Sequence, residues 1–167
     1  GSWAFDGCES LTSVTIPESV TEIGNGAFNG CDKLNCDMTT ILGVKLLNGL
    51  VVGYTEDCPS NLNLEGVRGI VGGAFRYCSS LESVIIPEGV TEIGDSAFCG
   101  CKSLKCVTIP ESVTKIGSWA FDGCESLTSI TIPESVTKIG DRAFNGCESL
   151  TSIVIPEGVT EIGDSAF

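Results

Sequence analysis

The chain has 167 residues, 42% of them hydrophobic, and its 22 acidic and 9 basic residues give a formal charge of −13. This apolar content is sufficient for a buried core, so we expect a folded chain. The negative charge would repel DNA, RNA and anionic membrane surfaces, and no stretch approaches the roughly 18 apolar residues of a membrane-spanning helix. We therefore expect no nucleic acid partner and no membrane insertion of this segment.

Alanine-phenylalanine pairs divide the chain into repeats. They contain every alanine and every phenylalanine, and the phenylalanines recur every 23 residues, except for an interval of 47 residues between Phe28 and Phe75. Self-similarity at such a period is typical of solenoids, in which each repeat forms one coil, so we expect about seven coils. The column comprises Phe5, Phe28, Phe75, Phe98, Phe121, Phe144 and Phe167.

Each regular coil contains a strand signal followed by a second apolar pair. Val14-Thr15-Ile16 and its copies alternate inward and outward side chains before a proline ends the strand. Val20 and Ile23 form the second pair of the first coil, and the glycine that follows predicts a tight turn. These glycines are Gly24, Gly94, Gly117, Gly140 and Gly163.

A single coil of this size cannot bury its own apolar side, whereas stacked coils share a continuous core. The repeats therefore predict a right-handed, mainly β solenoid. We expect one parallel sheet built from the Val-Thr-Ile strands, at a strand spacing of ~4.8 Å, with short extended or 3₁₀ segments on the other side.

In the long interval the pattern is irregular, since Asp37 stands at the position of a strand valine. Two short apolar runs in residues 43–54 flank Asn48-Gly49, a strong hairpin signal. We expect a hairpin or a bulged coil within residues 36–64, where Leu62-Asn63-Leu64 resumes the regular strand.

The repeat as a whole has the pattern C-x-x-L-x-x-[VI]-x-I-P-E-x-V-T-x-I-G-x-x-A-F-x-G, as in Cys124 to Gly146. Over nearly the whole chain it closely resembles the BspA-like class of leucine-rich repeats. The resemblance implies a leucine-rich-repeat solenoid in a secreted or cell-surface protein of bacteria or of some protists, often linked to adhesion to host proteins or other cells.

Six of the ten cysteines share one column, where we expect a ladder of buried free thiols. Side chains that stack in the same direction have poor geometry for disulfide bonds. Of the other four, Cys36 and Cys58 are candidates for a bridge that clamps the irregular coil. The column contains Cys8, Cys31, Cys78, Cys101, Cys124 and Cys147, and the other four cysteines are Cys36, Cys58, Cys99 and Cys106.

No catalytic, cofactor or metal site is expected. Cys99, Cys101 and Cys106 lack the C-x₂-C spacing of a zinc site, and the chain has no histidine to complete a mixed site or to activate a nucleophile. A glycine-rich phosphate loop is also missing from the sequence. We therefore predict a non-enzymatic protein.

A glutamate column after the proline has two interpretations. Its carboxylates form either a calcium-binding ridge or exposed turn residues that keep the chain soluble, and the second is favoured. The column contains Glu18, Glu65, Glu88, Glu111, Glu134 and Glu157.

Small, mostly neutral side chains line the outer face of the expected sheet, and two tryptophans share a surface column. We take both as candidates for a surface that binds a protein partner. A threonine row that begins at Thr21 leaves a carbohydrate- or ice-binding surface as a remote alternative. The candidate binding residues are Ser13, Thr15, Ser83, Ile85, Thr108, Ser129, Thr131, Ser152, Val154, Trp3 and Trp119.

Residues 1–13 are identical to residues 117–129, and the array begins and ends within a coil, without polar capping segments. We expect a single array over residues 1–167, uncapped at both ends. Two functions follow from these features. One is adhesion or protein recognition outside the cell or at its surface, and the alternative is end-to-end stacking of chains into a filament.

Overall fold

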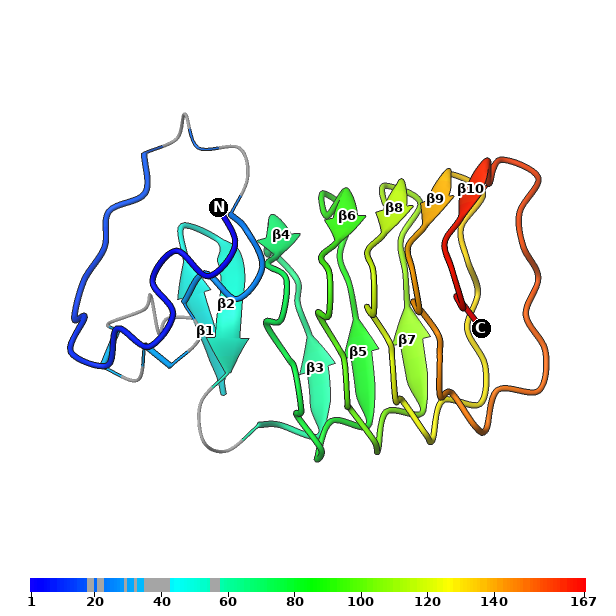
Figure 1. Cartoon of the computed structure of the whole chain (residues 1–167), viewed down its shortest axis with the longest axis horizontal. Helices are drawn as coiled ribbons and strands as arrows, with labels where there is room; N and C mark the ends of the chain where they lie inside the picture. Colours follow the sequence, from blue (N-terminus) through cyan, green and yellow to red (C-terminus); the bar gives the residue numbers. More distant parts are fainter. Residues whose placement is uncertain (18–19, 21–22, 29, 32, 35–42, 55–57) are drawn as a thin grey trace.

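The structure is a computed structural model that describes residues 1–17, 20, 23–28, 30–31, 33–34, 43–54 and 58–167. These residues form a stack of coils along one axis, with the N-terminal repeats at one end and β10 at the other (Figure 1). The described residues contain no helix. They therefore contain no helix that is long and apolar enough to cross a membrane. The predicted solenoid with parallel strands is confirmed.

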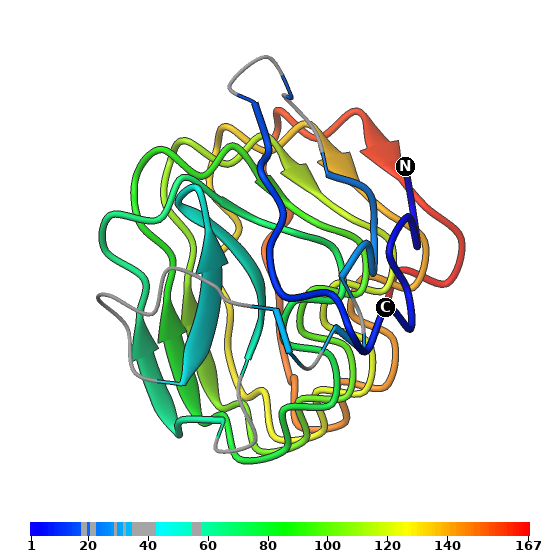
Figure 2. The ribbon, with the colours of Figure 1, turned by 90° about the vertical axis from the view of Figure 1, so that its left-hand side faces the viewer.

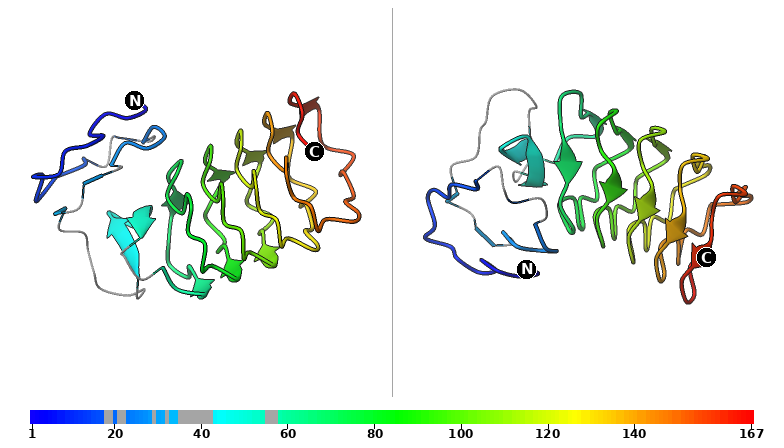
Figure 3. Two further views of the ribbon diagram at one scale, coloured as in Figure 1. Left: turned by 60° about the horizontal axis from the view of Figure 1, so that its bottom comes forward. Right: turned by 90° about the horizontal axis from the view of Figure 1, so that it is seen from above.

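Two sheets run along the stack and form separate rows of strands (Figure 3). The longer sheet is parallel except for its first pair, β1 with β2. The shorter sheet is parallel throughout. In order, the longer sheet contains β1 (Val44–Leu47), β2 (Leu50–Tyr54), β4 (Gly69–Ile70), β6 (Glu92–Ile93), β8 (Lys115–Ile116), β9 (Lys138–Ile139) and β10 (Glu161–Ile162), and the shorter one contains β3 (Asn61–Asn63), β5 (Ser83–Ile85) and β7 (Cys106–Thr108).

Beyond the hairpin, the longer sheet forms at the second apolar pair of each coil, where we expected only short extended or 3₁₀ segments. Hydrogen bonds of threonine side chains reinforce it, because Thr114 and Thr137 each donate Oγ1 to the threonine carbonyl one coil earlier, at 3.2 and 3.3 Å. Among the residues that the structure describes, the predicted Val-Thr-Ile strand forms only in β3, β5 and β7. In the next coil the hydrogen bond from Thr128 N to Lys105 O has lengthened to 3.4 Å, and no strand is present there.

Stacked phenylalanine rings form the centre of the core. From Phe75 to Phe167 neighbouring ring centroids lie 5.3 to 5.5 Å apart and nearly parallel. Tyr54 extends this ladder on the N-terminal side, 6.5 Å from Phe75, and its hydroxyl donates to the Arg76 carbonyl at 3.1 Å. The irregular coil therefore supplies an aromatic ring to the core although it has no alanine-phenylalanine pair.

The glycine column serves close packing of coils and not the tight turn that we predicted. None of these glycines has a positive φ. A Cβ added at Gly117 would lie 2.7 Å from Asp95 N and 2.8 Å from Gly94 C, so a side chain would collide with the backbone of the preceding coil. The left-handed conformation occurs two residues later instead, for example at Trp119 (φ 63).

The expected hairpin is present and divides the core in two. Asn48 and Gly49, with φ of 51 and 74, form its turn, as a primed hairpin turn requires. Leu47 packs in a small N-terminal core with Phe28, whereas Val51 belongs to the main core. Along the stack, β1 and β2 lie between the N-terminal repeats and the regular coils (Figure 1), and in the view down the stack the regular coils lie one behind another (Figure 2).

Candidate binding surfaces

The structure gathers seven of the eleven predicted surface residues on one side of the solenoid. Together with their neighbours in register they occupy the outward positions of β3, β5, β7 and the two coils that follow, a surface that we call the neutral face. All are exposed except the half-buried Ser83. The neutral face consists of Asn61, Asn63, Ser83, Ile85, Cys106, Thr108, Ser129, Thr131, Ser152 and Val154.

The other four predicted residues lie elsewhere. Ser13 and Thr15 are exposed, but they belong to the N-terminal repeats, on the far side of the hairpin from β3 (Figure 1). Trp3 and Trp119 are exposed as predicted, by 49% and 40%, yet they lie beside the alanine-phenylalanine turns and not on the neutral face.

No charged side chain belongs to the neutral face, although charges stand at both ends of its strands. Before the strands, Lys105 forms an ion pair with Glu82 at 2.7 Å. After them, exposed glutamates of the predicted column follow in each coil, such as Glu88 and Glu111. Uncharged side chains inside a charged border resemble the core and rim of a protein interface.

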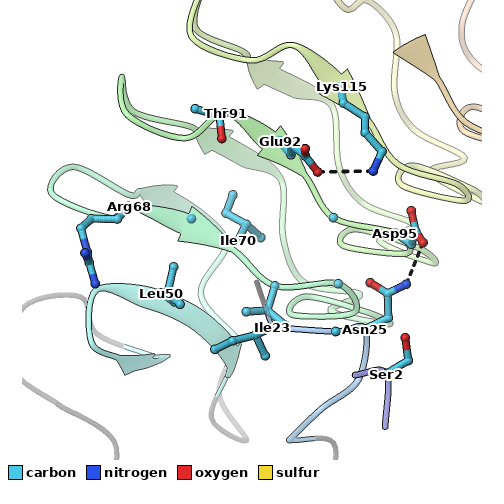
Figure 4. Close-up of a pocket in the computed structure, with 15 residues that line it drawn as sticks. Ser2, Ile23, Asn25, Leu50, Arg68, Ile70, Thr91, Glu92, Asp95 and Lys115 are labelled. Carbon is cyan, nitrogen blue, oxygen red and sulfur yellow. Dashed lines mark hydrogen bonds and ion pairs between the residues drawn. The ribbon is translucent and has the colours of Figure 1, made fainter. Parts of the chain in front are cut away.

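A second feature, which the sequence did not predict, is a groove along the outer side of the longer sheet. It contains two hollows of about 540 and 470 Å³ at equivalent positions of different coils. One wall of this sheet groove carries the outward residues of the strands, where Lys115 pairs with Glu92 at 3.3 Å and Lys138 pairs with Glu161 at 2.5 Å. Figure 4 shows the first hollow.

The opposite wall is held rigidly by its own hydrogen bonds. Asp95 accepts from the backbone N of Ser118 at 2.8 Å and from Nδ2 of Asn25 at 2.7 Å, across Gly72 (Figure 4). Asp141 repeats the first of these bonds by accepting from Asp164 N at 2.9 Å. These carboxylates join one coil to the next, so this wall of the groove is fixed by contacts between the coils.

A row of left-handed residues borders this wall. The residue before the alanine has a positive φ in all seven repeats, and five of the seven are not glycine. The six-membered ring of Trp3 lies over Gly26, in the space that a Cβ would occupy, and Cζ of Arg142 lies 5.4 Å from the Trp119 ring. The side chains of Trp3 and Arg142 thus pack against a neighbouring coil and remain exposed to solvent.

A further exposed aromatic residue escaped the sequence analysis. Tyr77 is 62% exposed and has a φ of 62 in a column that is otherwise glycine. Its ring lies over Gly100, and Cζ of Arg76 is 4.9 Å from the ring centroid. A tyrosine at a position that is glycine in the other repeats was the sequence signal that could have identified Tyr77 as an exposed aromatic residue.

The predicted ladder of buried free thiols is confirmed at Cys101 and Cys124, whereas Cys8 and Cys147 are only half-buried. The thiols of Cys101, Cys124 and Cys147 donate to phenylalanine carbonyls at 3.1 to 3.3 Å. Cys78 instead forms a disulfide with Cys58, so the predicted bridge between Cys36 and Cys58 is wrong, and Cys36 itself lies outside the described residues. The 6.0 Å between the Cα atoms of Cys58 and Cys78 suits a disulfide, because the irregular segment approaches the ladder from the side.

Burial makes the ladder thiols poor nucleophiles. It raises the pKa of Cys101 to about 12 and that of Cys147 to about 11, and it raises the pKa of Cys124 as well. A thiol must ionise to attack a substrate or to bind a metal. In the part of the chain that the structure describes, no group of three metal-ligating side chains is assembled. The ladder is a structural feature of the core.

Known proteins share both the repeat and the fold. The model of the BspA type leucine-rich repeat region matches residues 1–41 and 68–167 in 6 copies, and thus leaves out the part that contains the hairpin. No curated protein matches the chain significantly.

Three solved structures of bacterial leucine-rich repeat proteins are similar to the chain. The T. pallidum protein TpLRR shares 35% identity over 71% of this chain and 57% of its own, with a TM-score of 0.67. A leucine-rich cell surface protein from Faecalibacterium prausnitzii shares 37% identity over 92% of this chain and 35% of its own, with a TM-score of 0.53. A leucine-rich repeat protein from Bacteroides ovatus shares 34% identity over 100% of this chain and 37% of its own, with a TM-score of 0.59. The chain therefore spans less than two thirds of the length of each.

Proposed function

Since the chain belongs to the BspA-type leucine-rich repeat family, we propose that it is a non-enzymatic recognition module that binds a protein through the neutral face. The solenoid holds this face rigid, because each coil is fixed to the next by backbone hydrogen bonds and by the phenylalanine ladder. A rigid surface loses little conformational entropy when a partner binds.

One observation carries this proposal: the neutral face has no charge over five consecutive coils in a chain with a formal charge of −13. It also exposes two branched apolar side chains, Ile85 by 49% and Val154 by 81%. Charged residues are depleted in the buried part of protein interfaces, which supports a protein partner for this face over a small ion or a polyanion.

A cell-surface location is part of the proposal. The similar protein from Faecalibacterium prausnitzii is described as a cell surface protein. The disulfide between Cys58 and Cys78 supports the same location, because disulfides persist in oxidising compartments outside the cytosol. Adhesion to proteins of a host or of other cells is the function that fits both.

The test is binding of the purified chain to immobilised extracellular matrix proteins and to cultured epithelial cells. We expect Thr131→Arg, which puts a bulky charge in the middle of the neutral face, to weaken binding at least tenfold. Thr137→Arg on the longer sheet is the matched control and should bind like the unmodified chain. Equal binding by all three proteins would remove the neutral face as the interface. Negative-stain microscopy of the same samples would reveal filaments, which the alternative of end-to-end stacking requires.

A further inference from the structure

We propose that the sheet groove is a second binding site, which takes a neutral, linear β-linked glycan independently of the neutral face. The two hollows of about 540 and 470 Å³ lie within the range of small-ligand sites. They share the same columns of the repeat, so they are two stretches of one groove that follows the solenoid axis.

The charges of the first hollow favour a neutral ligand, whereas in the second hollow Lys138 lies beside two carboxylates, Asp141 and Glu161. In the first hollow, Arg68 and Lys115 balance Glu92 and Asp95, although the chain as a whole is strongly acidic. Lys115 pairs with Glu92 and Asp95 accepts from Asn25, yet each charged group has further donor or acceptor positions, and neither sign dominates in this hollow (Figure 4). This combination suits sugar hydroxyls, which donate and accept hydrogen bonds without carrying charge.

Apolar surface and hydroxyl groups complete the lining. Ile23 and Leu50 are half-buried in the first hollow, beneath the polar walls. Thr91 lines the first hollow and Thr160 lines the second, both exposed. A site with an apolar base and a few fixed polar groups is typical of specific small-ligand recognition.

A tryptophan follows one lining residue of each hollow in the sequence, although neither tryptophan lines a hollow itself. Ser2 lines the first hollow and precedes Trp3, and Ser118 lines the second and precedes Trp119. Atoms of the Trp3 ring fill the position that a Cβ of Gly26 would take, while 49% of the residue stays exposed. A partly exposed indole is a platform on which the apolar face of a sugar ring stacks, and at Trp119 the sugar would share the ring with Arg142.

The spacing of the coils favours a polymer over a single sugar. Groups of the same kind recur once per coil, and the ring centroids of the phenylalanines in neighbouring coils lie 5.3 to 5.5 Å apart. The sugars of an extended β-linked glycan recur at a similar interval. Each sugar can therefore meet an equivalent set of groups in the next coil, and many weak contacts add up along the groove.

The experiment uses cellohexaose, xylohexaose and chitohexaose as probes of the whole chain. Trp3 and Trp119 are the only tryptophans of the sequence, so the intrinsic emission reports on the two proposed platforms alone. We expect at least one probe to shift this emission and to release heat in calorimetry. Trp119→Gly should weaken its binding about tenfold, as for the loss of one stacking aromatic residue.

The variants are matched in backbone conformation. Trp119 and Tyr77 both have a left-handed φ, and both belong to columns in which other coils carry glycine, so Trp119→Gly and Tyr77→Gly should both fold. Unlike Trp119, which follows the lining residue Ser118, Tyr77 has no lining residue beside it in the sequence, and its variant should bind the glycan normally. Thr160→Arg should block the groove, whereas Thr131→Arg on the neutral face should not affect the glycan.

Two results would overturn the proposal: no binding of any of the three glycans at millimolar concentration, or equal weakening by Trp119→Gly and Tyr77→Gly. Neither result bears on protein binding by the neutral face, which responds to Thr131→Arg. A glycan site that fails and a recognition module that fails are therefore separate outcomes.

Discussion

Replacing Gly117 by alanine should destabilise the protein through a collision between coils. The added Cβ would lie 2.7 Å from Asp95 N and 2.8 Å from Gly94 C, and both atoms belong to the backbone of the preceding coil. That coil cannot retreat easily, because Gly117 N donates to Ile93 O at 2.9 Å beside the contact. Inserting one methyl group into a packed interior costs about 1–3 kcal/mol, and we expect about 3 kcal/mol here because the obstacle is main chain.

Gly123→Ala is the matched control. Gly123 has a φ of 69, but a Cβ there would have its nearest neighbour, Gly100 Cα, at 3.8 Å. This variant therefore loses only the left-handed preference of glycine, about 1–2 kcal/mol. Urea unfolding followed by circular dichroism and tryptophan emission measures the free energy of unfolding of both variants, and thermal unfolding measures their melting temperatures. At about 2–4 °C per kcal/mol for a chain of this size, the melting temperatures should fall by about 6–12 °C and 2–8 °C. If Gly123→Ala were the more damaging of the two, close packing would not be the reason for the Gly117 column.

Three further predictions concern the core. Phe121 lies between two rings at 5.4 Å, and Phe121→Ala should lower the free energy of unfolding by about 3–5 kcal/mol in thermal unfolding. Phe5 is already 37% exposed, so Phe5→Ala should lower it clearly less. Similar losses in the two variants would contradict the phenylalanine ladder as the main stabilising contact. Cys58→Ser should lower the free energy of unfolding by about 3 kcal/mol for a separation of 20 residues, and non-reducing peptide mapping should link Cys58 to Cys78; a link to Cys36 would refute this pairing. The pKa of Cys101 rises on folding from 9.0 to about 12, so above pH 9 the folded chain keeps a proton that the unfolded chain loses. The free energy of unfolding should therefore be unaffected by this thiol below pH 9 and should fall by about 1.4 kcal/mol per pH unit above it. Cys101→Ala should make this alkaline loss of stability less steep, and an unchanged slope would show that ionisation of Cys101 does not cause it.

The regular part of the fold could be predicted from the sequence because every coil repeats the same packing problem. The phenylalanine, leucine and cysteine columns identified the core, and Asn48-Gly49 identified the hairpin turn. Which apolar pair carries the longer sheet could not be predicted in this way. Both pairs contain β-branched residues, and the choice depends on how closely the coils approach at Gly94 and Gly117, a distance between repeats that one repeat does not encode.

Features outside the repeat register were harder to predict. Tyr54 joins the aromatic ladder from a hairpin, out of phase with the phenylalanines, so no column pointed to it. The bond between Cys58 and Cys78 was missed for the same reason, because Cys58 belongs to no cysteine column. The sheet groove is formed between two columns that were analysed separately, and only the folded coil brings Glu92 and Asp95 to opposite sides of one hollow. The neutral face, by contrast, follows directly from the alternation of inward and outward residues in a strand.

The left-handed row gives the array a means of diversification. Its backbone conformation is the same in every repeat, whether the residue is Trp3, Ser96 or Arg142, so the coil imposes the conformation and leaves the side chain free to vary. Recombination between copies of the repeat, in phase, would exchange one presented side chain for another and leave the core unchanged. A lineage could thus assemble new combinations of tryptophan, arginine and serine along the edge of the groove without evolving a new fold.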